Sequence, residues 1–464
     1  MTTKPRVPDL DMTDGVSTAV GLIDPALHGH YPSEGAMTTL PRVSNLDMIN
    51  GLSTAVDLVD PALHGHHRRA AFVACQIGEA MGLPAAQLGT LNLAAMVHDV
   101  GALSLAERLE TLNFEESEDA EPGRDWHAEV GYQLLKGFGP LAEAARIVRF
   151  HHIEWWEGRG HNHRGREVPQ DSHLLHLADR IAVLVQDGKE VLGQAADIRR
   201  RILDQKGQMF VPKFVDAFLD AASRETFWLR LDPKAEVNAK PEALQTEPQE
   251  SDDLEALAAL FSQIVDFRSH YTATHSAGVG ATAPALGTMA GLPPEDCAVL
   301  RVAGHLHDLG KLAVPVEVLE KPSKLTPQQY NLIKSHSYHT YRLLMASGVG
   351  EKLAQWAAFH HERPDGEGYP FHSSGDEFSM GSRIVAVADV FTALTEDRPY
   401  RKGLSPEACK TLLERMGKAK ALDGNLIALL LSRFEELNTA RAQGQEEALG
   451  QYRAFWDRVG AAVN

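Results

Sequence analysis

The sequence predicts an all-α fold built from two similar helical domains in tandem. Apolar residues recur at helical spacing in residues 70–81, 131–135 and 328–346, and no long stretch alternates polar and apolar residues. At roughly 100–200 residues per domain, 464 residues suffice for more than one domain. Histidine and aspartate also recur at matching intervals in the two halves, which indicates one helical module present twice.

The N-terminus carries a short, separate duplication. Residues 1–30 and 37–66 align without gaps and are identical at 22 of 30 positions. The second copy continues into a helix-patterned segment, whereas the first runs into YPSEG at 31–35, which stops a helix. We therefore predict that residues 1–36 are a poorly ordered extension, with Met37 as an alternative start.

The longer repeat is defined by three identical intervals. In both halves a histidine is followed after 32 residues by a His-Asp pair, after 29 more by a histidine, and after 24 more by a His-His pair. An aspartate follows 27 residues after the second histidine of the first His-His pair and 28 residues after that of the second. The first set is His66, His98, Asp99, His127, His151, His152 and Asp179, and the second is His275, His307, Asp308, His336, His360, His361 and Asp389.

Composition shifts predict the domain boundaries. Residues 232–253, DPKAEVNAKPEALQTEPQESDD, are polar and acidic and contain prolines, as is typical of a linker. We expect domains at 37–231 and 254–464 on either side of it. A long pair of helices at about 406–459 is expected to close the second domain.

Charge and cysteine content limit the function. The net charge of −18 disfavours nucleic-acid polymers and anionic membrane surfaces as partners, although metal ions in a cleft can still attract a small phosphorylated ligand. Three widely separated cysteines and an N-terminus without an apolar run favour a cytoplasmic protein. The uncharged stretch 276–294 contains Pro284 and much Gly, Ala and Thr, so we do not expect it to span a membrane.

The repeated residues have the chemistry of a metal site. Imidazole and carboxylate bind divalent ions such as Zn, Fe and Mn, and one carboxylate can bridge two of them. A single histidine on an apolar helix face is more often a hydrogen-bonded core residue. Seven such residues per module at repeated spacing favour metal binding instead.

Four motifs of the second module strongly resemble the HD-GYP family of HD-superfamily phosphohydrolases. They are HLHDLGK at 305–311, EKPSKLT at 320–326, HHERPDGEGYP at 360–370 and RIVAVADVFTALTEDRPYRKG at 383–403, and the resemblance covers about residues 255–435. The resemblance implies an all-helical bacterial signalling hydrolase with a two- or three-metal centre of iron or manganese, which hydrolyses cyclic di-GMP. The first module resembles the wider HD superfamily and has no GYP signature.

The resemblance also implies roles for particular residues. The metal ligands would be His275, His307, Asp308, His336, His360, His361 and Asp389, with Asp308 bridging, and Lys311 would be catalytic beside Asp308. Substrate would be bound by Arg398, Arg401, Tyr369, Gly368 and Pro370. Metal-activated hydroxide would attack phosphorus and expel the ribose 3′ oxygen, giving pGpG and, after a second cut, GMP.

Some positions depart from the family pattern. Tyr271 stands where some members have a glutamate that holds a third metal, so we expect two ions in the second module. Thr392 replaces a usual aspartate. In the first module Ala102 stands at the lysine position, and Trp155-Trp156 replaces the GYP turn, as packing residues or as a platform for a nucleobase.

Several alternatives remain open from sequence. The substrate could instead be cyclic GMP-AMP, or the protein could be an inactive metal- and nucleotide-binding receptor or scaffold. Zn, Mg, Ni and Co are alternatives to Fe and Mn. The two modules could pair within one chain or in a homodimer, with signalling proteins as further partners, and the first module's donor set is a second candidate metal site.

Overall fold

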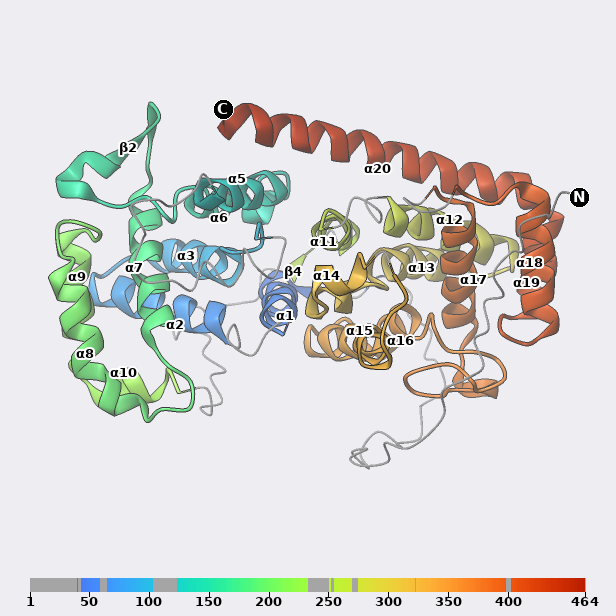
Figure 1. Cartoon of the computed structure of the whole chain (residues 1–464), viewed down its shortest axis with the longest axis horizontal. Helices are drawn as coiled ribbons and strands as arrows, with labels where there is room; N and C mark the ends of the chain where they lie inside the picture. Colours follow the sequence, from blue (N-terminus) through green and yellow to red (C-terminus); the bar gives the residue numbers. More distant parts are fainter. Residues whose placement is uncertain are drawn as a thin grey trace, which may run out of the picture. The chain divides into compact units, whose positions relative to one another are not determined.

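The structure is a computed structural model (Figure 1), and it describes residues 40, 43–58, 65–102, 123–232, 250–251, 254–268, 274–321, 323–397 and 402–463. The described chain consists of helices joined by turns and loops, with two pairs of two-residue strands, which confirms the predicted all-α class. By internal contacts the chain divides into Met1–Ala36 and Met37–Asn464. The predicted extension 1–36, most of the linker 232–253, and Tyr271, Arg398 and Arg401 lie outside the described residues.

The first domain is coloured blue to green in Figure 1. Its α-helices are α1 (Asn45–Asp57), α2 (His66–Ala80), α3 (Ala85–Val97), α5 (Gly123–Leu135), α6 (Ala142–Val148), α7 (Gln170–Leu184), α8 (Val191–Asp204), α9 (Pro212–Ala221) and α10 (Glu225–Leu229). Within the described residues of this domain, the 3₁₀ turns η3 (Gly139–Leu141) and η4 (Trp156–His161) and the antiparallel strands β2 (Asn162–His163) and β3 (Arg166–Glu167) connect the helices.

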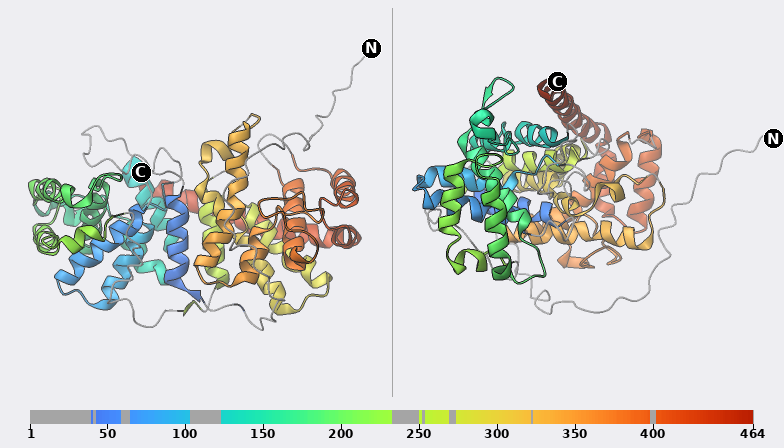
Figure 2. Two further views of the ribbon diagram at one scale, coloured as in Figure 1. Left: turned by 90° about the horizontal axis from the view of Figure 1, so that it is seen from below. Right: turned by 60° about the vertical axis from the view of Figure 1, so that its left-hand side comes forward.

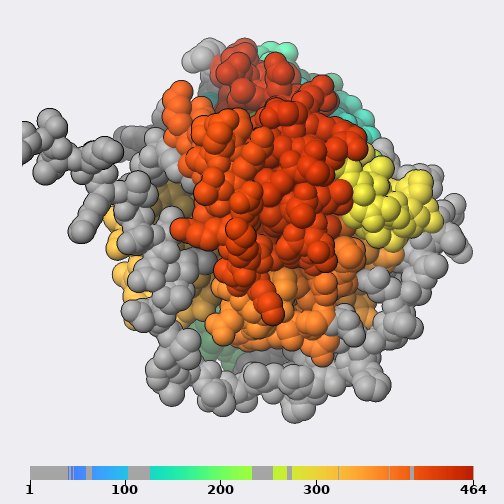
Figure 3. All heavy atoms as spheres, turned by 90° about the vertical axis from the view of Figure 1, so that its right-hand side faces the viewer, coloured from blue at the N-terminus to red at the C-terminus, as the bar shows by residue number. Residues whose placement is uncertain are grey.

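The second domain runs from yellow to red. Its α-helices are α11 (Leu254–Asp266), α12 (His275–Met289), α13 (Pro294–Leu306), α14 (Val316–Leu319), α15 (Pro327–Ala346), α16 (Glu351–Ala358), α17 (Met380–Thr395), α18 (Pro406–Lys418), α19 (Gly424–Ser432) and α20 (Phe434–Val463), with 3₁₀ turns η6 (Leu309–Ala313) and η7 (Gly375–Glu377). The predicted closing helix pair is wrong, because breaks at 419–423 and at Arg433 divide this stretch into three helices. Figure 3 shows the C-terminal residues in red covering much of one face of this domain.

The two domains repeat the same order of helices. The first histidine of each donor set is the first residue of its helix, α2 or α12, and the last aspartate lies within α7 or α17. Local sequence explains the helix boundaries. Pro84 and Pro293 are the N-caps of α3 and α13, and Thr326 and Gln329 form a reciprocal capping box at the start of α15.

The domains contact each other through their leading segments. Strand β1 (Val43–Ser44) pairs antiparallel with β4 (Glu250–Ser251), and α1 packs on both α3 of its own domain and α15 of the other, as the views in Figures 1 and 2 agree. A Cβ at Gly51 would lie 2.4 Å from Ser347 Oγ, so glycine permits this close crossing. Helix α20 reaches α5, where the rings of Trp126 and Trp456 stack with centroids 5.8 Å apart. The two modules of the chain therefore contact each other.

No helix in the described ranges is long and apolar enough to cross a membrane. Residues 276–289 of this stretch instead lie in α12, with Pro284 inside the helix, and α12 packs against α13, α17 and α20. Its small residues allow the close packing. Gly304 on α13, for example, lies against the backbone of Gly280.

Candidate metal centres

The structure brings all seven predicted donors of the second domain together. Helix α12 supplies His275, whose Nε2 lies 3.0 Å from Asp389 Oδ1 on α17. Asp308 lies between two groups of histidines. Its Oδ2 is 3.1 Å from His307 Nε2, and its Oδ1 is 3.4 Å from His336 Nε2 and 3.9 Å from His360 Nε2. A carboxylate with one oxygen toward each group has the geometry of a bridging ligand.

The remaining contacts join the second group of donors. His336 Nε2 and His360 Nε2 are 3.1 Å apart, and the His360 and His361 rings are neighbours with centroids at 4.2 Å. Candidate ligand atoms of His336, His360 and His361 all lie within 4.8 Å of one another, as do those of His275, His307 and Asp308. The donors thus form two clusters that meet at Asp308.

Backbone carbonyls orient the histidines. The Nδ1 atoms of His307, His336 and His360 lie 2.8, 2.6 and 2.8 Å from the carbonyl oxygens three residues earlier, those of Gly304, Ile333 and Ala357. When Nδ1–H donates to that oxygen, Nε2 faces the cluster with a free lone pair. The arrangement follows from the helical backbone, because residue i−3 lies under the ring.

Electrostatics also suit a divalent cation. Burial alone would raise the pKa of Asp308, but the adjacent His307 and Lys311 hold it well below its usual range. Burial lowers the pKa of His360 well below its usual value and that of His361 to about 4. The carboxylate is therefore charged and these two imidazoles are neutral at neutral pH, which is the state that ligates metal. The nitrogen and oxygen donors fit ions of the iron, manganese and zinc type.

Glu396 is a site residue that the sequence reasoning missed. Its Oε2 lies 3.1 Å from His275 Nδ1, on the side of the ring opposite Asp389, and also accepts a hydrogen bond of 3.1 Å from Gln445 Nε2 on α20. Burial would lower the pKa of His275, but Glu396 and Asp389 together raise it to about 10. Glu396 follows Asp389 by seven residues, which is two helical turns. This spacing could have indicated from sequence that both carboxylates lie on the same side of the chain.

We expect the Glu396→Gln variant to bind Mn(II) about 10-fold to 100-fold more weakly than the wild type, because the glutamine amide no longer orients His275 with a full negative charge. Titration of the metal-free protein with Mn(II), followed by electron paramagnetic resonance, measures this. Glu407→Gln, at an exposed position of α18, removes the same charge and should leave the affinity unchanged. Equal affinities for the two variants would contradict the assigned role.

Asp266 is a second residue that the sequence reasoning missed, and it stabilises the start of α12. Asp266 accepts hydrogen bonds from the backbone nitrogen and hydroxyl of Ser276, at 3.2 and 3.0 Å. In the first domain Asp57 makes a short contact with Nδ1 of His67. Each aspartate precedes the first donor histidine by nine residues, so the repeat itself contained this signal.

Lys311, the predicted catalytic lysine, contacts Asp308. Its Nζ is 2.5 Å from Asp308 Oδ2, and the side chain is 24% exposed, so it reaches both the donors and solvent. Burial would lower its pKa, but Asp308 raises it, and the amine is charged at neutral pH. Thr392 is fully buried, and its hydroxyl has no hydrogen-bond partner within the described chain.

The GYP turn lies beside the donors. The Tyr369 ring stacks on His361 with centroids 4.8 Å apart, and Lys334 Nζ is 5.9 Å from the Tyr369 ring. Buried Glu362 fixes the turn by accepting hydrogen bonds from the backbone nitrogens of Phe371 and Ser373. Gly368 packs so closely on Glu362 that an added Cβ would lie 2.5 Å from its Cα. Pro370 follows in the same turn.

The first domain also assembles its seven donors. His98 and His151 place Nδ1 at 2.8 and 2.6 Å from the carbonyl oxygens three residues earlier, as in the second domain. His127 Nε2 and His152 Nε2 are 3.1 Å apart, and Asp179 Oδ1 is 3.2 Å from His66 Nε2. The donor clusters are His66, His98 and Asp99, and Asp99, His127, His151 and His152.

Other features of this domain differ. Ala102, at the lysine position, is buried. Trp155 packs edge-on against His173 with ring centroids at 5.5 Å, which agrees with a packing role, whereas Trp156 is 50% exposed.

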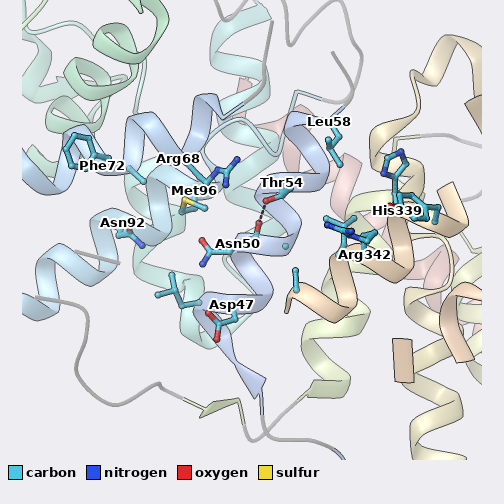
Figure 4. Close-up of a pocket in the computed structure, with 16 residues that line it drawn as sticks. Asp47, Asn50, Thr54, Leu58, Arg68, Phe72, Asn92, Met96, His339 and Arg342 are labelled. Atoms are coloured by element: carbon cyan, nitrogen blue, oxygen red, sulfur yellow. Dashed lines mark hydrogen bonds between the residues drawn. The ribbon is translucent and has the colours of Figure 1, made fainter. Parts of the chain in front are cut away.

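A cavity of about 800 Å³ lies around α1 at the domain boundary (Figure 4). Residues of α1, α2 and α3 line it from the first domain, including Asn50, Arg68 and Asn92, and α15 contributes His339 and Arg342. None of its lining residues is a predicted metal donor, so the cavity is separate from both centres.

Each domain thus has a buried His/Asp donor set, in which the aspartate of a His-Asp pair lies between two clusters. This arrangement can be compared with known protein families. A family model described as HD domain matches residues 259–426, and a second model of the same description matches residues 63–184. The chain belongs to the HD superfamily and carries two HD domains.

Three similar proteins extend this result. The 3'3'-cGAMP-specific phosphodiesterase 1 of Vibrio cholerae is 28% identical over 380 residues, which cover 79% of this chain and 86% of that protein. Cyclic di-GMP phosphodiesterase PA4108 of Pseudomonas aeruginosa is 40% identical over 149 residues, 32% of this chain and 36% of that protein. The crystal structure of the cyclic GMP-AMP phosphodiesterase V-cGAP3 of V. cholerae superimposes with a TM-score of 0.59 at 22% identity, covering 85% of this chain and 98% of that one, and supports the fold.

Proposed function

We propose that the second domain is an HD-GYP-type, metal-dependent phosphodiesterase that opens a 3′,5′-linked cyclic dinucleotide. The observation that carries the proposal is the position of Lys311 at 2.5 Å from Asp308, the carboxylate at which the two donor clusters meet. The first domain has the clusters without the lysine. We further propose domain boundaries at 37–231 and 254–464, which contain the two matched HD segments.

The donors His275, His307, Asp308, His336, His360, His361 and Asp389 would hold two divalent ions, of iron or manganese in the leading case. Such ions supply Lewis-acid stabilisation of phosphoryl oxygens and an activated water. Lys311 remains protonated at neutral pH and carries donor hydrogens beside the centre. It can hydrogen-bond a substrate phosphate or give a proton to the departing ribose 3′ oxygen.

In the proposed site, the GYP turn faces the substrate. Tyr369, fixed against His361, offers a ring face and a hydroxyl beside the centre. Gly368 and Pro370 shape the turn that carries it. Arg398 and Arg401 follow α17, and we propose that their guanidinium groups bind the phosphates.

The proposal has two candidate substrates, cyclic di-GMP and cyclic GMP-AMP. The motifs of the second domain resemble those of cyclic di-GMP hydrolases. The relative that matches over both domains is instead named as specific for 3'3'-cGAMP. This length of match favours cyclic GMP-AMP as the second candidate.

The test is a turnover assay on the intact chain, purified without oxygen and loaded with Mn(II) or Fe(II). Equal concentrations of cyclic di-GMP and 3′3′-cGAMP compete in one reaction, and linear products are quantified. We expect linear product from at least one, loss of turnover after chelation, and recovery when metal is restored. Binding of either nucleotide without hydrolysis by the metal-loaded protein would contradict the proposal and favour a receptor, the alternative motivated by Thr392.

A further inference from the structure

We propose that the cavity around α1 is a binding site for a nucleoside phosphate. Arg68 and Arg342 would contact the phosphates, and the side-chain amides of Asn50 and Asn92 would contact the base. The site lies apart from both metal centres, and binding there does not depend on the reaction proposed for the second domain.

The cavity has the size and the position of a small-molecule site. Its volume of about 800 Å³ lies within the roughly 300–1,000 Å³ of typical ligand sites, which often occur between domains. Helices α2 and α3 border it on one side of α1 and α15 borders it on the other (Figure 4). One face of α1 and its C-terminal end form the wall between them, because the lining residues recur at intervals of four: Leu46, Asn50, Thr54 and Leu58, and likewise Asp47 and Gly51.

Two arginines give this cavity a positive charge. Arg68 on α2 and Arg342 on α15 are both exposed, and Figure 4 shows them on the two sides of α1. Neither guanidinium has an ion pair or a hydrogen bond with another residue of the described chain. Asp47 is the one carboxylate among the described lining residues, so positive groups outnumber negative ones here, in a chain whose net charge is −18. Phosphate oxygens match the planar, bidentate geometry of a guanidinium group.

A buried amide in the cavity wall is poorly satisfied by the protein itself. Asn92 on α3 is 6% exposed, and its Oδ1 accepts from the thiol of Cys75 at 3.8 Å, which is a weak hydrogen bond. Leaving a buried amide without a strong partner costs free energy. Asn50 offers a second amide, because the hydrogen bond of 2.8 Å that it accepts from Thr54 Oγ1 uses its backbone carbonyl. Each amide carries a donor and an acceptor, as does the edge of a nucleobase.

Apolar side chains line much of the remaining wall. Phe72 and Met96 come from the first domain and Leu343 from the second, and all three are buried. Such surface suits the flat base and the ribose carbons of a nucleoside better than it suits a free inorganic anion.

A ligand in this cavity would contact helices that carry donors of both metal centres. Arg68 follows the donor His66 by two residues in α2, and Arg342 follows the donor His336 by six residues in α15. Binding would therefore hold the two domains together and raise the thermal stability of the intact chain.

The experiment is calorimetric titration of the intact, metal-free chain in the presence of a chelator, so that nucleotide cannot bind through metal ions. The probes are ADP and GDP, with inorganic pyrophosphate and the matching nucleosides as arms that lack the base or the charge. We expect at least one nucleotide to bind with a dissociation constant of about 1 mM or lower, and more tightly than pyrophosphate and its nucleoside. Arg68→Gln and Arg342→Gln should each weaken binding about 10-fold or more. Arg224→Gln and Arg415→Gln, exposed arginines that do not line the cavity, should leave it unchanged.

Asp308→Asn separates this site from the metal centre of the second domain, and it should bind the nucleotide as the wild type does. Loss of binding in Asp308→Asn would place the nucleotide at that centre and overturn the inference. Absence of binding by both nucleotides, equal affinity for pyrophosphate, or unchanged affinity in Arg68→Gln and Arg342→Gln would each overturn it as well. None of these results bears on the hydrolysis proposed for the metal-loaded second domain.

Discussion

The Asp308→Asn variant is expected to lose turnover by on the order of 10³-fold or more while remaining folded. Asp308 is the carboxylate at which both donor clusters of the second domain meet and the partner of Lys311. An asparagine amide offers one neutral oxygen in place of two charged ones. Asparagine therefore cannot act as a charged ligand toward both clusters, and Lys311 would lose its carboxylate partner.

Initial rates with metal-loaded protein measure this loss, and thermal unfolding shows whether the fold is kept. Glu317→Gln, at an exposed position of α14, removes one negative charge from the same domain and should leave the rate unchanged. Asp99→Asn makes the equivalent change in the first domain. If Asp99→Asn lost turnover while Asp308→Asn kept it, the first domain would be the catalytic one. That result would contradict our proposal.

The Gly310→Ala variant is expected to be the most destabilising small substitution near the centre. A Cβ at this position would lie 2.0 Å from the carbonyl oxygen of His336 and 2.7 Å from the nitrogen of Thr340, both backbone atoms of α15. The Gly310 nitrogen donates to Thr340 Oγ1 at 2.9 Å, and that hydroxyl donates to the His307 carbonyl at 3.0 Å. The added methyl group would push η6 away from α15 and separate Asp308 from His336.

We expect the free energy of unfolding to fall by about 3 kcal/mol, as for an overpacked core, with weaker Mn(II) binding. Urea unfolding of metal-free protein measures the first effect and metal titration the second. Gly450→Ala, in α20 with nothing within 4 Å of the added Cβ, should instead be neutral or stabilise by about 0.5 kcal/mol. Similar stabilities for the two variants would contradict this explanation. A Cβ added at Gly101 would likewise lie 2.0 Å from the carbonyl oxygen of His127, so one physical cause explains the glycine two residues after the aspartate of each His-Asp pair.

The candidate donors were predictable because their spacing is repeated, with three identical intervals and a last interval that differs by one residue. A single histidine in a helix could be part of the core. A second copy with three identical intervals favours metal binding instead, and the structure brings both sets of seven candidate donors together. Glu396 escaped the comparison because the first domain provided no matching residue to reveal it. Its contact with His275 spans 121 residues of sequence.

The sequence by itself determined the helical class, the duplication and the repeated spacing of fourteen candidate donors, because helical periodicity and repeated spacing are properties of local order along the chain. Only the tertiary structure decided which groups complete each centre. Arg180 was visible beside Asp179, but its burial against that carboxylate depends on how α7 packs. Likewise, the crossing of α1 and α15 at Gly51 depends on which helix faces meet. Such contacts join residues far apart in sequence, and no local pattern specifies them.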